Sequence, residues 1–278
     1  MKLGFCTPFS EEMVGFAAEA GFKCIEIFPG GPINPQTITQ TKIKKAREVL
    51  DAHGIVPSSV FYIGDYAAAD AAARRQATKN LKSMMDIAEG LGTKIVTTIA
   101  RVPADATLKD KLKSYKKSFS TFARMFEDRG MKLAIENWPA GGGNMACNVA
   151  NWEAMFNEVP SPAIGLEYDP SHLVWQRMDY LAALREFADR VYIFHAKDTQ
   201  ILRRVLARHG INGSERWWRF RVPGYGEIDW KAIFQALSDV GYAGDMVIEH
   251  EDPVFDGPRR KEGFRLGLKC LEQYVVQE

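Results

Sequence analysis

The strongest constraint on the fold is a repeated alternation along the chain. Short runs of β-branched and aromatic residues are each followed by a longer amphipathic stretch. This alternation is typical of βα units that build a parallel sheet. We expect eight strands, at residues 2–7, 23–28, 56–63, 94–99, 132–138, 163–169, 191–197 and 245–250.

Helix signals fill the intervals between these runs. The pattern predicts helices at 10–20, 41–53, 69–91, 108–129, 149–158, 179–188, 229–240 and 259–276. Ser10, Thr107 and Asp179 are placed to cap helix amino ends. Glycines just past five helical patterns suit left-handed positions at helix carboxyl ends: Gly21, Gly54, Gly92, Gly130 and Gly241.

Eight βα units in 278 residues predict a single (β/α)8 barrel, a TIM barrel of the α/β class, over residues 1–278. No linker rich in Pro and Ser divides the chain. A doubly wound sheet is the alternative, but it usually has a glycine-rich phosphate turn after its first strand. Thr7-Pro8-Phe9-Ser10 stands there instead. Residues 199–228, after the seventh strand, exceed the usual βα loop, and we interpret them as a lid or binding loop.

Composition restricts the partners and the compartment. Thirty-six basic and 35 acidic residues leave a net charge of +1, so we expect no nucleic-acid or membrane partner. The four cysteines are far apart and form no CxxC pair, which favours free thiols in a reducing compartment. No stretch approaches the roughly 18 apolar residues of a membrane span. We therefore expect a cytoplasmic protein.

Four predicted strands end in side chains that can bind a metal ion: Glu136, Asp169, His195 and Glu249. Active sites of such barrels lie at the carboxyl ends of the strands. Each acid alone is explained as a buried group paired with Arg or Lys. Four together on successive strands would leave uncompensated negative charge unless a cation bound there. Three carboxylates and one imidazole suit Mn2+, Co2+, Mg2+ or Fe2+ better than structural zinc.

These residues resemble the xylose isomerase-like TIM-barrel superfamily of sugar isomerases and epimerases, which includes tagatose/psicose 3-epimerase, hydroxypyruvate isomerase and inosose dehydratase. The resemblance covers nearly the whole chain. It rests on Ile135-Glu136-Asn137, Tyr168-Asp169-Pro170-Ser171-His172, Phe194-His195-Ala196-Lys197-Asp198, Pro223-Gly224-Tyr225-Gly226-Glu227-Ile228-Asp229-Trp230 and Ile248-Glu249-His250-Glu251. It implies that Glu136, Asp169, His195 and Glu249 hold one divalent metal, most often manganese, with Mg2+, Co2+, Fe2+ or Zn2+ as alternatives.

The resemblance also implies a reaction. In this reaction a proton next to the carbonyl of a sugar or keto-sugar is transferred, and the intermediate is a metal-bound enediolate. Glu136 and Glu249 are the implied acid and base. An alternative keeps the metal and becomes a lyase or dehydratase reaction on a keto-inositol or 3-keto-glycoside. A related apurinic-site endonuclease would need a three-zinc cluster, for which five histidines are few. A catalytically silent carbohydrate-binding or assembly protein is a further alternative.

Five further residues are candidates for substrate binding. The family counterpart of His172 contacts substrate oxygens, although an orienting role in its loop is the alternative. Trp138 is placed to form a sugar-facing wall or to pack in the core. Lys197 lies two residues after His195, so both side chains point to the same face of the strand, and Lys197 is placed to reach a substrate hydroxyl or the enediolate. Glu26 and Arg219 complete the set.

For Glu26, Glu167 and Arg219 the sequence allows more than one role. Alternation turns Glu26 into the barrel, where it is placed to support a metal ligand or to belong to a polar layer. Glu167 shares the parity of Asp169 and has no assigned role. Arg219 lies in the segment from Arg216 to Arg221, whose aromatic and basic residues suit sugar binding, a subunit contact or loop packing. The tryptophans of this segment, Trp217 and Trp218, favour a homodimer or homotetramer.

Overall fold

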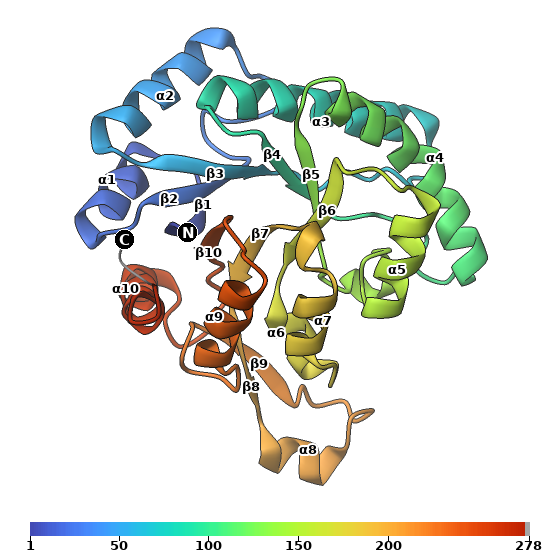
Figure 1. The fold of residues 1–278 in the computed structure, drawn as a ribbon, viewed down its shortest axis with the longest axis vertical. Coiled ribbons are helices and arrows are strands. Elements are labelled where there is room, and N and C mark those ends of the chain that lie inside the picture. Colours follow the sequence, from blue (N-terminus) through green and yellow to red (C-terminus); the bar gives the residue numbers. More distant parts are fainter. Residues whose placement is uncertain (276–278) are drawn as a thin grey trace.

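The computed structural model describes residues 1–275, and in it eight parallel strands close into a barrel (Figure 1). Around the barrel the order is β1, β10, β7, β6, β5, β4, β3 and β2. This confirms the predicted TIM barrel and excludes the doubly wound sheet. The strands are β1 (Leu3–Pro8), β2 (Cys24–Phe28), β3 (Val56–Phe61), β4 (Ile95–Thr98), β5 (Lys132–Glu136), β6 (Ile164–Tyr168), β7 (Val191–Ala196) and β10 (Asp245–Ile248).

Helices surround the barrel and follow the strands as predicted (Figure 1). They are α1 (Glu11–Ala20), α2 (Gln40–His53), α3 (Ala71–Leu91), α4 (Leu108–Glu127), α5 (Val149–Glu158), α6 (Pro170–Trp175), α7 (Tyr180–Glu186), α9 (Trp230–Asp239) and α10 (Arg260–Glu272). The short α6, directly after β6, was not predicted. Residue 276 of the expected last helix lies outside the described residues.

The residues predicted to cap helices are confirmed. The side chains of Ser10, Thr107 and Asp179 each accept a hydrogen bond from a backbone N–H in the first turn of a helix. All five glycines expected at helix carboxyl ends have positive φ, between +58° and +96°. Only glycine adopts this conformation without a Cβ penalty, so these positions end the helices where the sequence indicates.

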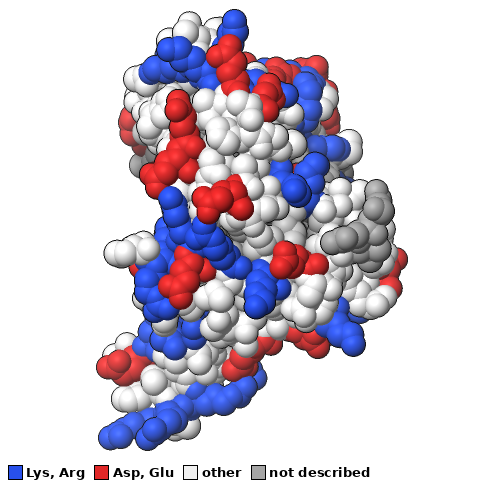
Figure 2. Space-filling model, turned by 90° about the vertical axis from the view of Figure 1, so that its left-hand side faces the viewer, with Lys and Arg blue, Asp and Glu red and all other residues white. Residues whose placement is uncertain are grey.

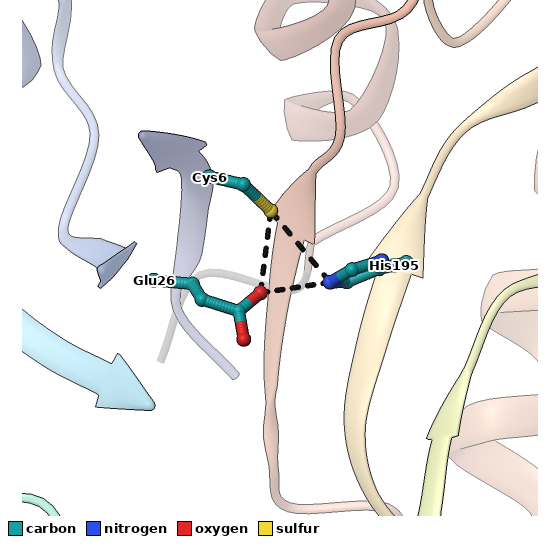
Figure 3. Close-up of side chains that lie close together, drawn as sticks. All are labelled: Cys6, Glu26 and His195. Carbon is teal, nitrogen blue, oxygen red and sulfur yellow. Dashed lines mark hydrogen bonds and ion pairs between the residues drawn. The ribbon is translucent and has the colours of Figure 1, made fainter. Parts of the chain in front are cut away.

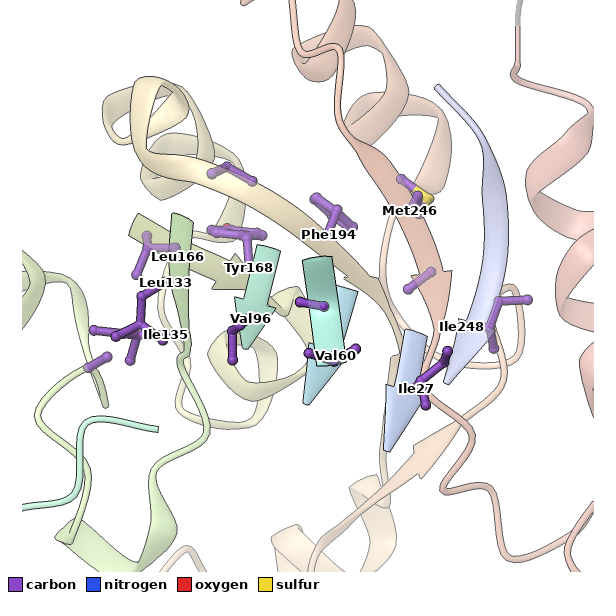
Figure 4. Close-up of a cluster of buried hydrophobic side chains, with 14 of the residues drawn as sticks. Ile27, Val60, Val96, Leu133, Ile135, Leu166, Tyr168, Phe194, Met246 and Ile248 are labelled. Atoms are coloured by element: carbon purple, nitrogen blue, oxygen red, sulfur yellow. The ribbon is translucent and has the colours of Figure 1, made fainter. Parts of the chain in front are cut away.

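Alternation along the strands separates an outer apolar face from the barrel interior. Outward side chains such as Ile27, Val60 and Leu133 are fully buried beneath the helices (Figure 4). Inside the barrel, Cys24, Ile193 and Val247 form a small apolar cluster. Polar residues lie two positions further along the chain from each of these three, at Glu26, His195 and Glu249. The barrel interior is therefore apolar near the amino ends of the strands and polar toward their carboxyl ends.

The segment expected as a long loop is an ordered arm. It contains β8 (Asp198–Ile201), α8 (Arg203–His209) and β9 (Trp218–Arg221), and β8 pairs with β9 in antiparallel fashion. The arm projects from the barrel beyond α6 and α9 (Figure 1). Blue side chains line its tip in Figure 2, where α8 exposes Arg203, Arg204 and Arg208. Over the rest of the face shown, basic and acidic groups are interspersed.

Asp198 anchors the base of this arm. Its fully buried carboxylate accepts hydrogen bonds from backbone N–H groups and from an indole N–H. The donors are Thr199 N at 2.8 Å, Gly224 N at 3.1 Å, Ile228 N at 3.1 Å and Trp230 Nε1 at 3.0 Å. A Cβ on Gly226 would lie 2.0 Å from Asp198 Oδ1, so the turn after β9 requires glycine at this position.

Two further expectations concern the whole chain. All four cysteines are free thiols. Within residues 1–275, no helix has both the length and the apolar composition that a membrane crossing requires.

Candidate active site

The four residues predicted to bind a metal come from adjacent strands. Glu136 is the last residue of β5, Asp169 directly follows β6, His195 is the penultimate residue of β7, and Glu249 directly follows β10. These strands are consecutive neighbours in the barrel. Because parallel strands bring their carboxyl ends to one face, the four side chains meet at the same end of the barrel.

Three carboxylates form the centre of the site, with an imidazole on either side. Glu136, Asp169, Glu249 and His172 each offer one ligand atom, and these atoms lie within 4.8 Å of one another. His195 approaches from the barrel interior. Its Nδ1 lies 3.3 Å from Glu249 Oε2 and 4.0 Å from Glu136 Oε1. The structure therefore brings together all four residues of the predicted metal set and adds His172 beside them.

The residues present fit a divalent cation. Asp169 and His195 are fully buried, and Glu136 is 4% exposed. Within the described part of the chain, His195 Nδ1 has no hydrogen-bond partner, although it faces two carboxylates. Three carboxylate oxygens and an imidazole nitrogen are donors that divalent metals of the manganese type accept.

Lys197 supplies positive charge to the site in this structure. Its ammonium nitrogen lies 3.1 Å from Asp169 Oδ2 and 2.9 Å from Glu251 Oε2, and it also pairs with Glu249. Burial alone would lower the pKa of Lys197, but the three carboxylates raise it well above its usual value. Lys197 therefore remains charged although it is only 1% exposed.

The two predicted acid and base residues have different surroundings. Burial and the nearby Glu249 carboxylate raise the pKa of Glu136 to about 8. Burial also acts to raise the pKa of Glu249, but Lys197 and His195 outweigh it and hold that pKa below its usual value. The structure thus favours a protonated Glu136 beside an ionised Glu249. Burial, and then Lys197, lower the pKa of His172 to about 4, so its imidazole is neutral.

A cavity of about 280 Å³ opens above these groups. Its lining combines polar and charged residues, Glu136, Glu249, Glu251, Lys197 and His172, with apolar ones, Phe28, Phe61, Ile63, Trp138 and Phe220. Trp138 is 38% exposed, so part of its ring is free to contact a ligand. Among the predicted substrate-binding residues, Trp138, His172 and Lys197 therefore line the cavity.

Glu26 and Arg219, the two remaining candidates for substrate binding, make their contacts elsewhere. The Arg219 guanidinium donates from Nε to Gln200 Oε1 at 2.8 Å, across the two strands of the arm. Glu26 is fully buried inside the barrel and contacts His195. Neither residue lines the cavity.

A polar cluster lies inside the barrel, behind His195. Figure 3 shows Cys6, Glu26 and His195 pointing toward one another from β1, β2 and β7. His195 Nε2 lies 2.7 Å from Glu26 Oε2, and the Cys6 thiol donates to the same oxygen at 3.3 Å. Glu167 Oε1 lies 3.0 Å from His195 Nε2. Both inward carboxylates predicted from strand parity therefore reach the second nitrogen of His195.

Several cavity residues were missed from the sequence, although parity contains a signal for some of them. Phe28 lies two residues after Glu26, and Glu251 lies two residues after Glu249, so each continues an inward-facing row. Phe61 and Ile63 follow the same rule at the end of β3. Phe220 lies on β9, and no local pattern predicts that this strand returns to the barrel mouth.

A larger cavity, of about 610 Å³, lies at the opposite end of the barrel. It is lined by Lys132 and Val191, which begin β5 and β7, and by Tyr192 and Tyr242. Conserved chemistry in TIM barrels lies at the carboxyl ends of the strands, whereas this end serves stability. We therefore take the smaller cavity, where the buried titratable groups gather, as the candidate active site.

The fold and this cluster define a TIM-barrel protein with an acidic and histidine-containing site at the carboxyl ends of its strands. The model of the family described as "Xylose isomerase-like TIM barrel" matches residues 14–274. The chain belongs to this family, as its motifs indicated.

Relatives by sequence include the YfiH protein and inosose dehydratases. The chain is 25% identical to YfiH of Bacillus subtilis (strain 168), with 100% of both chains covered. It is 32% identical to inosose dehydratase of Geobacillus thermodenitrificans (strain NG80-2) over 127 residues, which are 44% of this chain and 41% of the relative.

Solved structures share the fold. D-psicose 3-epimerase of Clostridium cellulolyticum H10 superposes with a TM-score of 0.77 at 16% identity, covering 99% of both chains. The IolI protein, solved with a bound zinc atom, superposes with a TM-score of 0.78 at 19% identity, covering 100% of both chains.

Proposed function

We propose that this protein is a divalent-metal-dependent sugar isomerase or epimerase. The observation that carries the proposal is the convergence of Glu136, Asp169, Glu249 and His195 beside a cavity lined by charged and aromatic residues. Epimerase structures with the same fold support the reaction class. The substrate is a small sugar or keto-sugar, since aromatic rings suit the apolar face of a sugar ring.

Glu136, Asp169, His195 and Glu249 would hold the metal. Their oxygen-rich donor set favours Mn2+, with Mg2+, Co2+, Fe2+ and Zn2+ as alternatives, and the zinc in IolI shows that a protein of this fold binds a divalent metal. When bound, the cation acts as a Lewis acid that stabilises negative charge on substrate oxygens. The negative charge of the ionised carboxylates of this cluster would attract the cation.

Glu136 and Glu249 carry the proton transfer in this proposal. They come from β5 and from the end of β10, with β6 and β7 between them in the barrel. They therefore reach a substrate from two sides. One carboxylate removes the proton next to the carbonyl, and the other returns a proton to the neighbouring atom or to the opposite face. This arrangement serves both isomerisation and epimerisation.

The remaining cavity residues bind and orient the substrate. His172 and Lys197 are placed to hydrogen-bond hydroxyl groups, and the ring of Trp138 covers an apolar face. Phe28, Phe61 and Phe220 contribute apolar surface that excludes water from the cavity. A drier cavity strengthens the electrostatic interactions that stabilise charge on the reacting carbon and oxygen atoms.

A dehydratase is the second candidate function, and the inosose dehydratase relatives favour it. The same base would remove the same proton, and a hydroxyl group on the next carbon would leave as water. The product then differs from the substrate by the mass of one water, whereas an isomerised or epimerised product has unchanged mass. Mass spectrometry of the product distinguishes the two reactions.

The test of the proposed function replaces each carboxylate with its amide. Glu136→Gln and Glu249→Gln should each lower turnover at least about 100-fold on a panel of ketoses, 3-keto sugars and keto-inositols. Circular dichroism should show an unchanged fold. Glu153→Gln, at an exposed position on α5, is the matched control and should keep wild-type turnover. Substantial turnover by both active-site variants would contradict the assignment.

A further inference from the structure

His195 contacts the proposed metal site with one nitrogen and a pair of buried carboxylates with the other. Nδ1 faces Glu249 and Glu136. Nε2 lies 2.7 Å from Glu26 Oε2 and 3.0 Å from Glu167 Oε1 (Figure 3). All three side chains of this inner contact are fully buried. The imidazole is thus held between two groups of acids.

Other strands fix the Glu26 carboxylate in turn. Thr97 Oγ1, on β4, donates to Glu26 Oε1 at 2.5 Å. The Cys6 thiol, on β1, donates to Glu26 Oε2 at 3.3 Å. Both carboxylate oxygens of Glu26 therefore have a donor besides the imidazole, so the orientation of the carboxylate is determined before any ligand binds.

We propose that Glu26, with Glu167 beside it, is a positioning residue that holds His195 in the tautomer with hydrogen on Nε2 and so directs the Nδ1 lone pair at the metal. A neutral imidazole carries one hydrogen, and a carboxylate facing one ring nitrogen decides where that hydrogen lies. A carboxylate behind a metal-bound histidine also makes the histidine a stronger ligand. This inference rests on the proposed metal site.

The placement of Glu26 argues against a substrate contact. Glu26 is absent from the lining of the cavity, and the His195 ring lies between it and the Glu249 carboxylate. A general role in barrel packing does not account for the geometry either. Two carboxylates converge on a single nitrogen, and burying them is costly unless they serve a charged or hydrogen-bonding partner.

Two variants test the inference at the level of metal binding. Glu26→Gln keeps the shape of the side chain and removes its charge, and Thr97→Val keeps the charge and removes the hydroxyl that orients it. Glu26→Gln should weaken Mn2+ binding, measured by titration calorimetry, by about 10 to 100-fold. Thr97→Val should weaken it by a smaller factor. Thr78→Val, at a half-buried threonine on the outer helix α3, is the matched control and should not change the affinity.

A spectroscopic measurement separates positioning from mere stabilisation of the fold. In protein labelled with 15N at histidine and loaded with Cd2+, His195 should show hydrogen on Nε2 and coupling of 113Cd to Nδ1. Glu26→Gln should change the His195 signals and leave those of the exposed His53 in place. A structural role would lower the melting temperature without moving the affinity or the tautomer.

Three outcomes would overturn the inference. Unchanged Mn2+ affinity in both variants, with normal binding by the wild type, would overturn it while leaving the proposed function intact. Failure of the wild type to bind any divalent cation would overturn both. Two Co2+ ions per chain, with a thiolate absorption band that Cys6→Ser abolishes, would make Cys6 and Glu26 ligands of a second metal instead of supports of His195.

Discussion

The ammonium nitrogen of Lys197 lies 3.1 Å from Asp169 Oδ2, among the carboxylates that we propose as metal ligands. The same nitrogen pairs with Glu249. Lys197 thus neutralises part of the negative charge to which a divalent cation would bind. A cation that enters the site must displace the ammonium group, or it binds more weakly because the two positive charges repel each other.

We therefore predict that Lys197→Met strengthens Mn2+ binding. Removing a like charge that contacts the proposed ligands Asp169 and Glu249 should lower the dissociation constant at least about tenfold, as titration calorimetry would measure. Turnover should fall in the same variant, because Lys197 lines the substrate cavity. Lys45→Met, at an exposed position on α2, should change neither quantity. Weaker metal binding in Lys197→Met would show that the ammonium group does not compete with the cation.

The two histidines of the site should differ in their effect on the metal. His195→Ala removes a proposed metal ligand and should weaken Mn2+ binding by more than about 100-fold. Loss of a residue that only hydrogen-bonds to a ligand costs roughly 10 to 100-fold. His172→Ala should bind Mn2+ with nearly the wild-type affinity and raise KM for the substrate, because we assign His172 a substrate contact. Metal content after dialysis, measured by mass spectrometry, gives an independent check. If His172→Ala loses the metal and His195→Ala keeps it, His172 is the metal ligand and His195 is not.

Asp198 should be important for stability through the arm. Asp198→Ala leaves the donors of Gly224, Ile228 and Trp230 without their acceptor. Unsatisfied buried donors are costly, so the free energy of unfolding should fall by about 3 kcal/mol in urea titrations. The exposed helix cap variant Asp179→Ala should lose only about 1 kcal/mol. Equal losses in the two variants would contradict the anchoring role.

An ion pair on the outer helices should make stability depend on pH. Hydrogen bonds from Arg129 and Lys94 lower the pKa of Glu89 to about 2. Because this folded-state pKa lies below the unfolded value of about 4.3, the pair stabilises the fold above that value and loses its effect as the pH falls toward 2. The pair is partly exposed, so its contribution at pH 7 is only about 0.5 to 1 kcal/mol.

The measurement for this pair is the difference in unfolding free energy between the wild type and Glu89→Gln. The difference should be present at pH 7 and should shrink steadily between about pH 4 and pH 2. A difference that stays constant over this range would show that the carboxylate charge of Glu89 does not contribute.

Strand alternation explains how much of the site could be predicted. Glu136, Asp169, His195 and Glu249 each stand at a strand end with a regular period of two before them, so their meeting follows from the barrel alone. The same parity placed Glu26 and Glu167 inside the barrel. It did not show how deep they lie, because depth depends on the stagger between strands, which the hydrogen-bonding register determines.

The structure of the arm could not be predicted from the sequence. The basic and aromatic residues around Arg219 suited sugar binding, a subunit contact or loop packing alike. In the structure, β8 and β9 pair so that Arg219 bonds to Gln200. Stacking of Trp218 on Trp175, with ring centroids 4.7 Å apart, uses further aromatic surface within the protein. These contacts form between segments that are separate in the sequence. The composition of the segment alone does not show whether its basic and aromatic residues contact other parts of the protein or a ligand.

The central claim is metal-dependent proton transfer next to a carbonyl. The most direct test is NMR detection of deuterium uptake from heavy water into a panel of ketoses, 3-keto sugars and keto-inositols, with Mn2+ and again with a chelator. We predict uptake at the carbon beside the carbonyl that requires the metal and disappears in Glu249→Gln. A product formed with Mn2+ present but without any deuterium uptake, or uptake that persists fully in the chelator, would contradict the account.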